Sequence, residues 1–231
     1  MSTVRRHLPL GARADAVELL DGGCLSLPEV EQNLVDLARL NGLPGGTATS
    51  IAGITRLLDK KDEARILDVG TGRADMPIAF AERGWRTTAL DTNADVLSIA
   101  TRATAGEPRI EVMTGDARAL PFEDRAFDVG HCSLLVHHLE PDAVVAVLRG
   151  LRRVARRGIV INDLRRGLFP LVATAVSVAA FGRTHVTRRD GIASARRAYT
   201  LDELDGMLAA ADLEIRWRSS RWMPRVVTVA A

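Results

Sequence analysis

The stretch ILDVGTGRAD, residues 66–75, decides the fold. It opens with a short apolar, β-branched run, which is typical of a buried strand. Gly70 and Gly72 then predict a tight turn, and a helix is expected over residues 74–83, ending at Gly84. Small residues are needed in such a turn when a ligand must approach the backbone closely. The stretch therefore predicts a strand, a ligand-binding turn and a helix in succession.

The alternation of strand and helix continues towards the C-terminus. Asn93 is expected to cap one helix, Pro141 to open another, and Thr200 with Glu203 to form the capping box of a third. Such alternation implies a parallel sheet covered on both faces. Further strands are predicted at residues 85–91, 109–116, 127–136 and 158–163, and a final pair, close enough to form a hairpin, at residues 213–220 and 225–231.

The segments outside this alternation have other patterns. Residues 1–62 contain two helical runs, the first beginning after Ser26, and are expected to form an N-terminal helical cap on a domain of residues 63–231. Residues 165–199 are expected to be a substrate-covering insertion. Its apolar part, residues 167–182, is predicted to be a lid over a lipophilic pocket, a dimer face or an ordinary buried helix. Its basic part, residues 183–197, is predicted to be a solvated loop, or alternatively to meet an acidic group on the substrate.

Composition excludes several classes of protein. The set AVILMFWYC makes up 47% of the 231 residues, enough for a sizeable core, and the net charge of +2 is too small to predict nucleic-acid binding. Cys24 and Cys132 lack metal-binding spacing and are expected to be buried thiols. No signal peptide is seen, and residues 167–182 are too short to span a bilayer, so a cytoplasmic protein is expected.

Three acidic residues are predicted at the carboxyl ends of three consecutive strands. Asp68, Asp91 and Asp116 would face one crevice, where open α/β sheets bind ligands, although each alone could be a turn or cap residue. A carboxylate at Asp91 suits the hydroxyls of a ribose, and one at Asp116 suits the amine of a purine. Asp75 stands where a dinucleotide-binding turn would have its third glycine. A carboxylate there suits a cationic ligand better than a pyrophosphate and disfavours NAD.

With these residues the chain resembles the class I S-adenosylmethionine-dependent methyltransferases of the UbiE-like, methyltransferase type 11 group. The resemblance is carried by LDVGTGRAD, ALDTN, TGDARALPFEDRAFDVGHCSLLVHHL and GIVINDL, within residues 64–164. It implies a Rossmann-like fold with a seven-stranded, mostly parallel sheet and an antiparallel C-terminal strand. It also implies S-adenosylmethionine as cofactor. Ala74 departs from the family pattern, which usually has a glycine there, and cofactor binding is expected to survive this change.

The resemblance also implies roles for individual residues. Asp68 would lie near the amino group of the cofactor, Asp91 would hold its ribose, and Asp116 with Ala117 would recognise adenine. His131, Cys132 and Ser133 would flank the methionine tail. The full predicted cofactor site is Asp68, Gly70, Thr71, Gly72, Asp75, Asp91, Thr92, Asp116, Ala117, Cys132 and Ser133.

The catalytic candidates are His137, His138 and Asp163. An imidazole is a suitable base for a phenolic proton. Alternatively, one histidine caps the following helix and the other packs, while Asp163 forms an Asx turn or pairs with Arg165 or Arg166. No metal is predicted: catechol-type enzymes have an acid after the fourth strand, which is absent here, although Asn162-Asp163 matches their second position.

The sequence thus predicts an enzyme that methylates a small, lipophilic or aromatic acceptor in secondary metabolism, with a phenol or quinol oxygen favoured. Methylation of carbon or nitrogen is the alternative within the class. An NAD-dependent oxidoreductase and a non-catalytic cofactor-binding scaffold are the alternatives from other classes. A homodimer is a further expectation, and neither a nucleic-acid partner nor a membrane span is expected.

Overall fold

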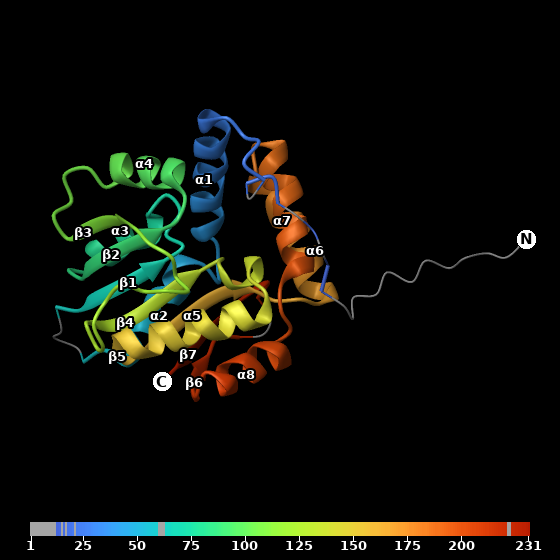
Figure 1. Ribbon diagram of the computed structural model, residues 1–231. Coiled ribbons are helices and arrows are strands. Elements are labelled where there is room, and N and C mark those ends of the chain that lie inside the picture. Colours follow the sequence, from blue (N-terminus) through green and yellow to red (C-terminus); the bar gives the residue numbers. More distant parts are fainter. Residues whose placement is uncertain (1–12, 15, 17, 21, 60–62, 221–222) are drawn as a thin grey trace, which may run out of the picture.

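The computed structural model describes residues 13–14, 16, 18–20, 22–59, 63–220 and 223–231. Its strands form one sheet in the order β3-β2-β1-β4-β5-β7-β6 (Figure 1). They are β1 (Arg65–Val69), β2 (Arg86–Asp91), β3 (Ile110–Thr114), β4 (Phe127–Ser133), β5 (Ala155–Leu164), β6 (Ile215–Arg218) and β7 (Arg225–Ala230).

The sheet is parallel except at β7, which pairs antiparallel to β5 on one side and to β6 on the other. The predicted seven-stranded sheet with its antiparallel C-terminal strand is therefore confirmed, as is the final hairpin. Because β1, β2 and β4 are parallel neighbours, their carboxyl ends meet at one edge of the sheet. That edge carries the predicted glycine turn and Asp91.

Helices cover both faces of the sheet. They are α1 (Leu27–Asn41), α2 (Thr47–Leu57), α3 (Asp75–Ala81), α4 (Ala94–Ala103), α5 (Pro141–Val154), α6 (Leu168–Phe181), α7 (His185–Arg197) and α8 (Leu201–Ala210), with a 3-10 turn, η1 (Val136–His138). The caps predicted at Asn93 and Thr200 are present, and the first helix begins after Ser26 as expected. The helix expected over 74–83 is shorter than predicted: it begins after Ala74, which takes a left-handed conformation, and it ends at Ala81 with Glu82 as its C-cap.

Strand alternation divides the core into two layers. On β1, Leu67 and Val69 pack with α5 and α8, whereas Ile66 packs with α2 and α3. The two helices of the predicted cap differ in their surroundings: α2 lies against β5 and β7, while α1 contacts α4, α6 and α7. The predicted boundary at residue 62 lies outside the described residues and stays a prediction.

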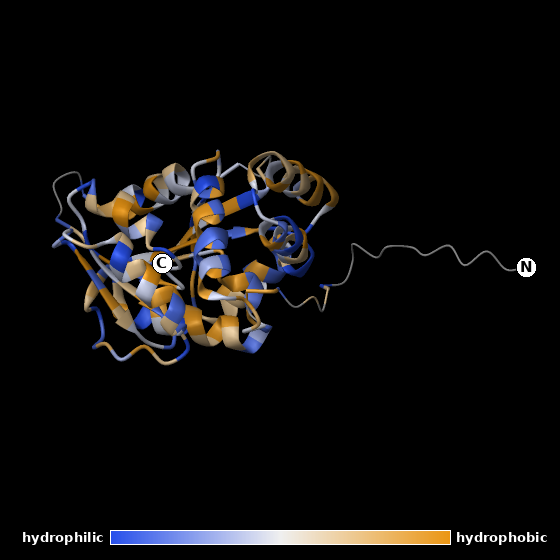
Figure 2. Cartoon of the chain, turned by 90° about the horizontal axis from the view of Figure 1, so that it is seen from above, coloured by the Kyte–Doolittle hydropathy of each residue, from blue (hydrophilic) through white to orange (hydrophobic). Residues whose placement is uncertain are grey.

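The segment 165–199 forms two packed helices beside α1 (Figure 1). Residues 183–197 were expected as a solvated loop, and this is wrong: residues 185–197 form α7, which buries Val186, Thr187, Asp190, Ser194 and Ala195. The helix is polar but half-buried, so its composition resembles that of a loop. Seen from above, it lies blue beside the mostly orange α6 (Figure 2). No helix within the described residues is long and apolar enough to cross a membrane.

Candidate active site

A cavity of about 1210 Å³ lies at the carboxyl ends of β1, β2 and β4, with α1, α6 and α7 on its other side. It is lined at one end by the glycine turn and the acidic residues. At the other end it is lined by side chains of the three helices. Most of the predicted site residues line it: Asp68, Gly70, Thr71, Gly72, Asp75, Asp91, Thr92, Asp116, Ala117, Ser133, His137 and His138.

The glycine turn owes its shape to left-handed backbone. Gly70 has φ 68° and Gly72 has φ 56°, values that favour glycine. The N–H groups of Gly70 and Thr71 both donate to the carbonyl of Leu90, at 2.9 and 3.2 Å, which fastens the turn to β2. A Cβ on Gly72 would meet Leu34 Cδ2 at 3.7 Å, an ordinary van der Waals contact, so the backbone there is not closely packed. The turn therefore leaves room for a ligand against the backbone.

Asp91 ends β2 and faces this room. Its carboxylate accepts hydrogen bonds from the N–H groups of Asn93 at 3.1 Å and Gly72 at 3.3 Å. Burial raises the pKa of Asp91 above its ordinary value, although these N–H groups oppose the rise. The backbone bonds fix the carboxylate at the mouth of the glycine turn, as expected for a group that holds a diol.

Asp68 is buried and firmly held. It accepts a hydrogen bond from Thr71 Oγ1 at 2.7 Å and pairs with His131 Nδ1 at 2.6 Å, while His131 Nε2 lies 3.0 Å from Ser50 Oγ. His131 is fully buried and does not line the cavity. It therefore does not flank a bound ligand, as had been expected, but positions Asp68 from behind.

The expectation that Cys132 lines the cofactor site is also wrong. The side chain is 1% exposed and packs in the core between the sheet and α5. Successive residues of a strand point to opposite faces, so Cys132 faces the helix layer while the backbone continues to the cavity at Ser133. Cys24, expected to be buried, is exposed.

A buried arginine from β7 joins the site without having been predicted. Arg225 donates to Ser133 Oγ at 2.8 Å and to Asn162 Oδ1 at 3.1 Å, and it also bonds Asn41 Oδ1. Asn41 in turn donates to Asp75 Oδ2 at 2.7 Å. Burial lowers the pKa of Arg225 to about 10 and raises that of Asp75. The network links α1, α3, β4, β5 and β7.

Asp116 lies at the cavity rim with Ala117. Its two carboxylate oxygens are bonded by the guanidinium of Arg118, at 2.7 to 3.0 Å, and these bonds hold the pKa of Asp116 below its ordinary value. Recognition of adenine by Asp116 stays a prediction. It would have to compete with Arg118 for the same oxygens.

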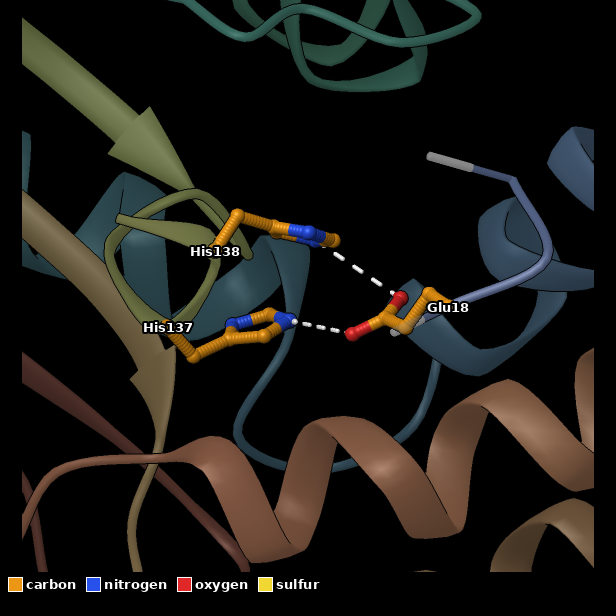
Figure 3. A group of neighbouring side chains, drawn as sticks. All are labelled: Glu18, His137 and His138. Atoms are coloured by element: carbon orange, nitrogen blue, oxygen red, sulfur yellow. Dashed lines mark ion pairs between the residues drawn. The ribbon is translucent and has the colours of Figure 1, made fainter. Parts of the chain in front are cut away.

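The predicted catalytic histidines lie beside Glu18, a partner that was not predicted from the sequence. His137 Nδ1 pairs with Asp163 Oδ1 at 2.6 Å, and its Nε2 lies 3.6 Å from Glu18 Oε1. His138 Nε2 lies 3.7 Å from Glu18 Oε2, so both rings point towards one carboxylate (Figure 3). Asp163 also accepts hydrogen bonds from the N–H groups of Val136 and His137, and it orients His137 from outside the cavity.

This arrangement makes the two histidines unequal as candidates for a general base. Burial disfavours the charged form of His137, but Asp163 and Glu18 outweigh it and raise its pKa to about 9. At neutral pH the ring is therefore protonated and has no lone pair with which to accept a proton. His137 is therefore unsuited to the role of base that was predicted for it. Half-buried His138 lines the cavity and remains a candidate for the base.

The helical end of the cavity is mainly apolar, with a few polar atoms. Leu34 and Leu37 of α1 and Val178 and Phe181 of α6 line it. Asn33 Oδ1 and Thr174 Oγ1, on residues that also line it, are buried without a hydrogen-bond partner among the described residues. Buried polar atoms normally have partners, so these two are suited to a bound molecule.

The residues at the sheet end fit S-adenosylmethionine. Left-handed glycines leave backbone accessible, Asp91 suits a ribose diol, and the acidic Asp68 and Asp75 suit an ammonium group. A pyrophosphate would instead meet these carboxylates at the start of α3. The chemistry of the donor set therefore favours a nucleoside that carries a positive charge.

Comparison with known proteins agrees with this geometry. Residues 66–158 match the model of a methyltransferase domain family. The chain is 33% identical over 108 residues to a demethylmenaquinone methyltransferase of Bacillus velezensis, covering 45% of this chain and 46% of that protein. It is 36% identical over 102 residues to the ubiquinone/menaquinone biosynthesis C-methyltransferase UbiE of Paracoccus denitrificans, covering 41% of each. The chain thus spans about half the length of the curated relatives it matches.

A solved structure extends the likeness in fold. A SAM-dependent methyltransferase from Aquifex aeolicus superposes with a TM-score of 0.62 at 17% identity, covering 89% of this chain and 98% of that one. The sheet, its antiparallel strand and the helices on both faces are therefore a shared architecture.

Proposed function

Because the chain carries a class I S-adenosylmethionine-dependent methyltransferase domain, we propose that the whole protein methylates a small lipophilic or aromatic acceptor. One observation supports this above all. A single cavity joins the glycine turn and Asp91 to the apolar end beneath α1, α6 and α7. A donor and an acceptor bound at its two ends would lie next to each other. The non-catalytic scaffold alternative predicts no such acceptor space.

The proposed roles at the donor end follow from the contacts there. Asp91 accepts hydrogen bonds from the ribose, Asp68 and Asp75 face the ammonium group, and Gly70 and Gly72 let the ligand lie on the backbone. S-adenosylmethionine, when bound, supplies an electrophilic methyl group. The chain itself contributes alignment, since methyl transfer depends on close in-line positioning of the acceptor atom.

At the acceptor end, the apolar wall formed by Leu34, Leu37 and Val178 excludes water and favours a lipophilic ring. Asn33 Oδ1 and Thr174 Oγ1 offer an acceptor and a hydroxyl to polar substituents of that ring. We place His138 as the base that removes a hydroxyl proton. This supports a phenol or quinol oxygen as the methylated atom.

Transfer to carbon is the second candidate. The Paracoccus denitrificans relative is named a C-methyltransferase, and both curated relatives are named for quinone chemistry. Loss of a hydroxyl proton also activates the ring carbon beside it, so the same base serves either outcome. Mass spectrometry with nuclear magnetic resonance of the product separates a methoxy group from a ring methyl group.

Three further proposals concern assembly, location and metabolic role. A homodimer is supported by the apolar outer side of α6. A cytoplasmic location and a role in secondary metabolism rest on sequence composition and on the lipophilic cavity.

The cofactor is tested by calorimetric titration of S-adenosylmethionine and S-adenosylhomocysteine into the full chain. The wild type is expected to bind with micromolar Kd, about 8 kcal/mol. Asp91→Ala should raise Kd about 100-fold, because hydrogen bonds to a charged acceptor are worth ~1.5–3 kcal/mol each. Asp95→Ala, an exposed acidic residue on α4 that does not line the cavity, is the matched control and should bind normally. Absence of binding by the wild type would overturn the proposal.

A further inference from the structure

Glu18, His137 and His138 form a group that the proposed function uses only in part. Each of the three side chains offers one ligand atom, a ring nitrogen or a carboxylate oxygen, and these atoms all lie within 4.8 Å of one another (Figure 3). Glu18 comes from the N-terminal segment, while the histidines come from η1, so the fold brings together residues far apart in the chain. The tilted histidine rings, with centroids 4.2 Å apart, point in one direction.

The spacing within this group is suited to an ion. The two nitrogen–oxygen separations, 3.6 and 3.7 Å, are longer than a good hydrogen bond. Ligand atoms on a tetrahedral ion with bonds of ~2.1 Å lie about 3.4 Å apart, so small adjustments would let all three reach one ion. We propose that Glu18, His137 and His138 bind one divalent transition-metal ion at the wall of the cavity.

Two neighbouring side chains hold the ligands in the required orientation. Asp163 takes the Nδ1 side of His137 at 2.6 Å, which turns Nε2 towards Glu18. An ion bound there would replace the proton that Nε2 carries when no ion is bound. Ser194 donates to Glu18 Oε1 at 2.7 Å and fixes the carboxylate. A carboxylate behind a ligating histidine is the usual support of a metal site, because it sets the tautomer and the ring orientation.

The ligand set also indicates which ion. Two imidazoles and one carboxylate favour Zn²⁺ or Fe²⁺, whereas Mg²⁺ prefers oxygen ligands and retained water. Three protein ligands leave at least one coordination position, and all three residues line the cavity, so that position faces the acceptor space. This last step rests on the proposed function: an acceptor hydroxyl bound there would lose its proton to solvent. His138 would then act as a ligand rather than as the base.

The test uses the full chain, freed of metal by dialysis against a chelator and titrated with Zn²⁺ by calorimetry and with Co²⁺ by visible absorption. One ion per chain is expected, with Kd at least about ten-fold weaker in Glu18→Gln and in His138→Gln. His185→Gln, which removes an exposed histidine at the start of α7, is the matched control and should bind as the wild type does. Circular dichroism checks that each variant is folded. If His138→Gln does not fold, the affinity of Glu18→Gln for the ion tests the metal site.

Failure of this proposal is distinguishable from failure of the proposed function. Absence of a stoichiometric ion in the wild type, or equal binding by Glu18→Gln, would overturn the metal site. If S-adenosylhomocysteine still binds in that case, the proposed function stands. Binding of Zn²⁺ without binding of S-adenosylhomocysteine would support the metal site and overturn the cofactor.

Discussion

At the residue scale, Arg225 links secondary-structure elements whose contact its local sequence does not predict. Its guanidinium bonds Asn41, Asn162 and Ser133, so a buried cation ties together α1, β5 and β4. We expect Arg225→Met to lower the free energy of unfolding by about 3 kcal/mol, because it leaves buried polar groups without their partner. The midpoint of urea unfolding measures this.

The control for that experiment is Arg216→Met, on the neighbouring strand β6. Arg216 is exposed and pairs with exposed Glu214, so the expected change is below about 0.5 kcal/mol. Equal stability losses in the two variants would contradict the role given to the buried network.

The individual site residues divide by how local their signals are. The glycine turn and Asp91 could be predicted, because residue type and position within a strand–turn–helix unit decide their surroundings. Glu18 and Arg225 could not, since each acts on partners more than 60 residues away in the sequence. The prediction for Cys132 was wrong by one residue along the strand. Because successive side chains point to opposite faces of the sheet, that residue faces the helices rather than the cavity.

At the scale of elements, Asp36 fastens α1 to the start of α7. Its carboxylate accepts hydrogen bonds from the N–H groups of Arg183 at 2.7 Å and Thr184 at 3.0 Å, and from Thr187 Oγ1 at 3.0 Å. Asp36→Ala should therefore cost about 2 kcal/mol and increase hydrogen exchange in the first turn of α7. Glu31→Ala, an exposed acidic residue on the same helix, is the control and should change neither.

The same contact gives stability a pH dependence. Burial opposes the charge of Asp36, but the N–H groups and Arg39 outweigh it and lower its pKa. A carboxyl group with a lowered folded-state pKa stabilises the fold above its unfolded pKa, and this contribution is lost as pH falls through the folded value. Thermal melts below about pH 4 should therefore show a smaller gap between the wild type and Asp36→Ala. A gap that does not narrow on acidification would count against the charged bond.

At the scale of the whole molecule, the fold could be predicted where strands are buried on both faces, because burial leaves a run of apolar residues in the sequence. The strands before and after the glycine turn are apolar runs that end in turn residues, so their alternation with helices predicted a mostly parallel sheet. The polar α7 left no such pattern, because it packs through hydroxyl and carboxylate contacts such as Asp190 with the Leu19 and Leu20 N–H groups. Helices that are held by such long-range polar contacts could not be predicted from the composition of the sequence.

At the same scale, the exposed apolar side of α6 predicts a homodimer. One side of the helix lines the cavity, while the other leaves large apolar side chains exposed, among them Leu168, Val172 and Val176, the last 63% exposed. Contiguous exposed apolar surface marks interaction sites. Sedimentation velocity should therefore give a dimer of the 25.0 kDa chain. Val176→Glu should convert it to a monomer, because a charge would be buried at the contact. Ile215→Glu, placed on β6 and 40% exposed in the wild type, should leave the dimer intact. A wild type that sediments as a monomer at tens of micromolar would contradict the dimer and leave α6 with the single role of covering the cavity.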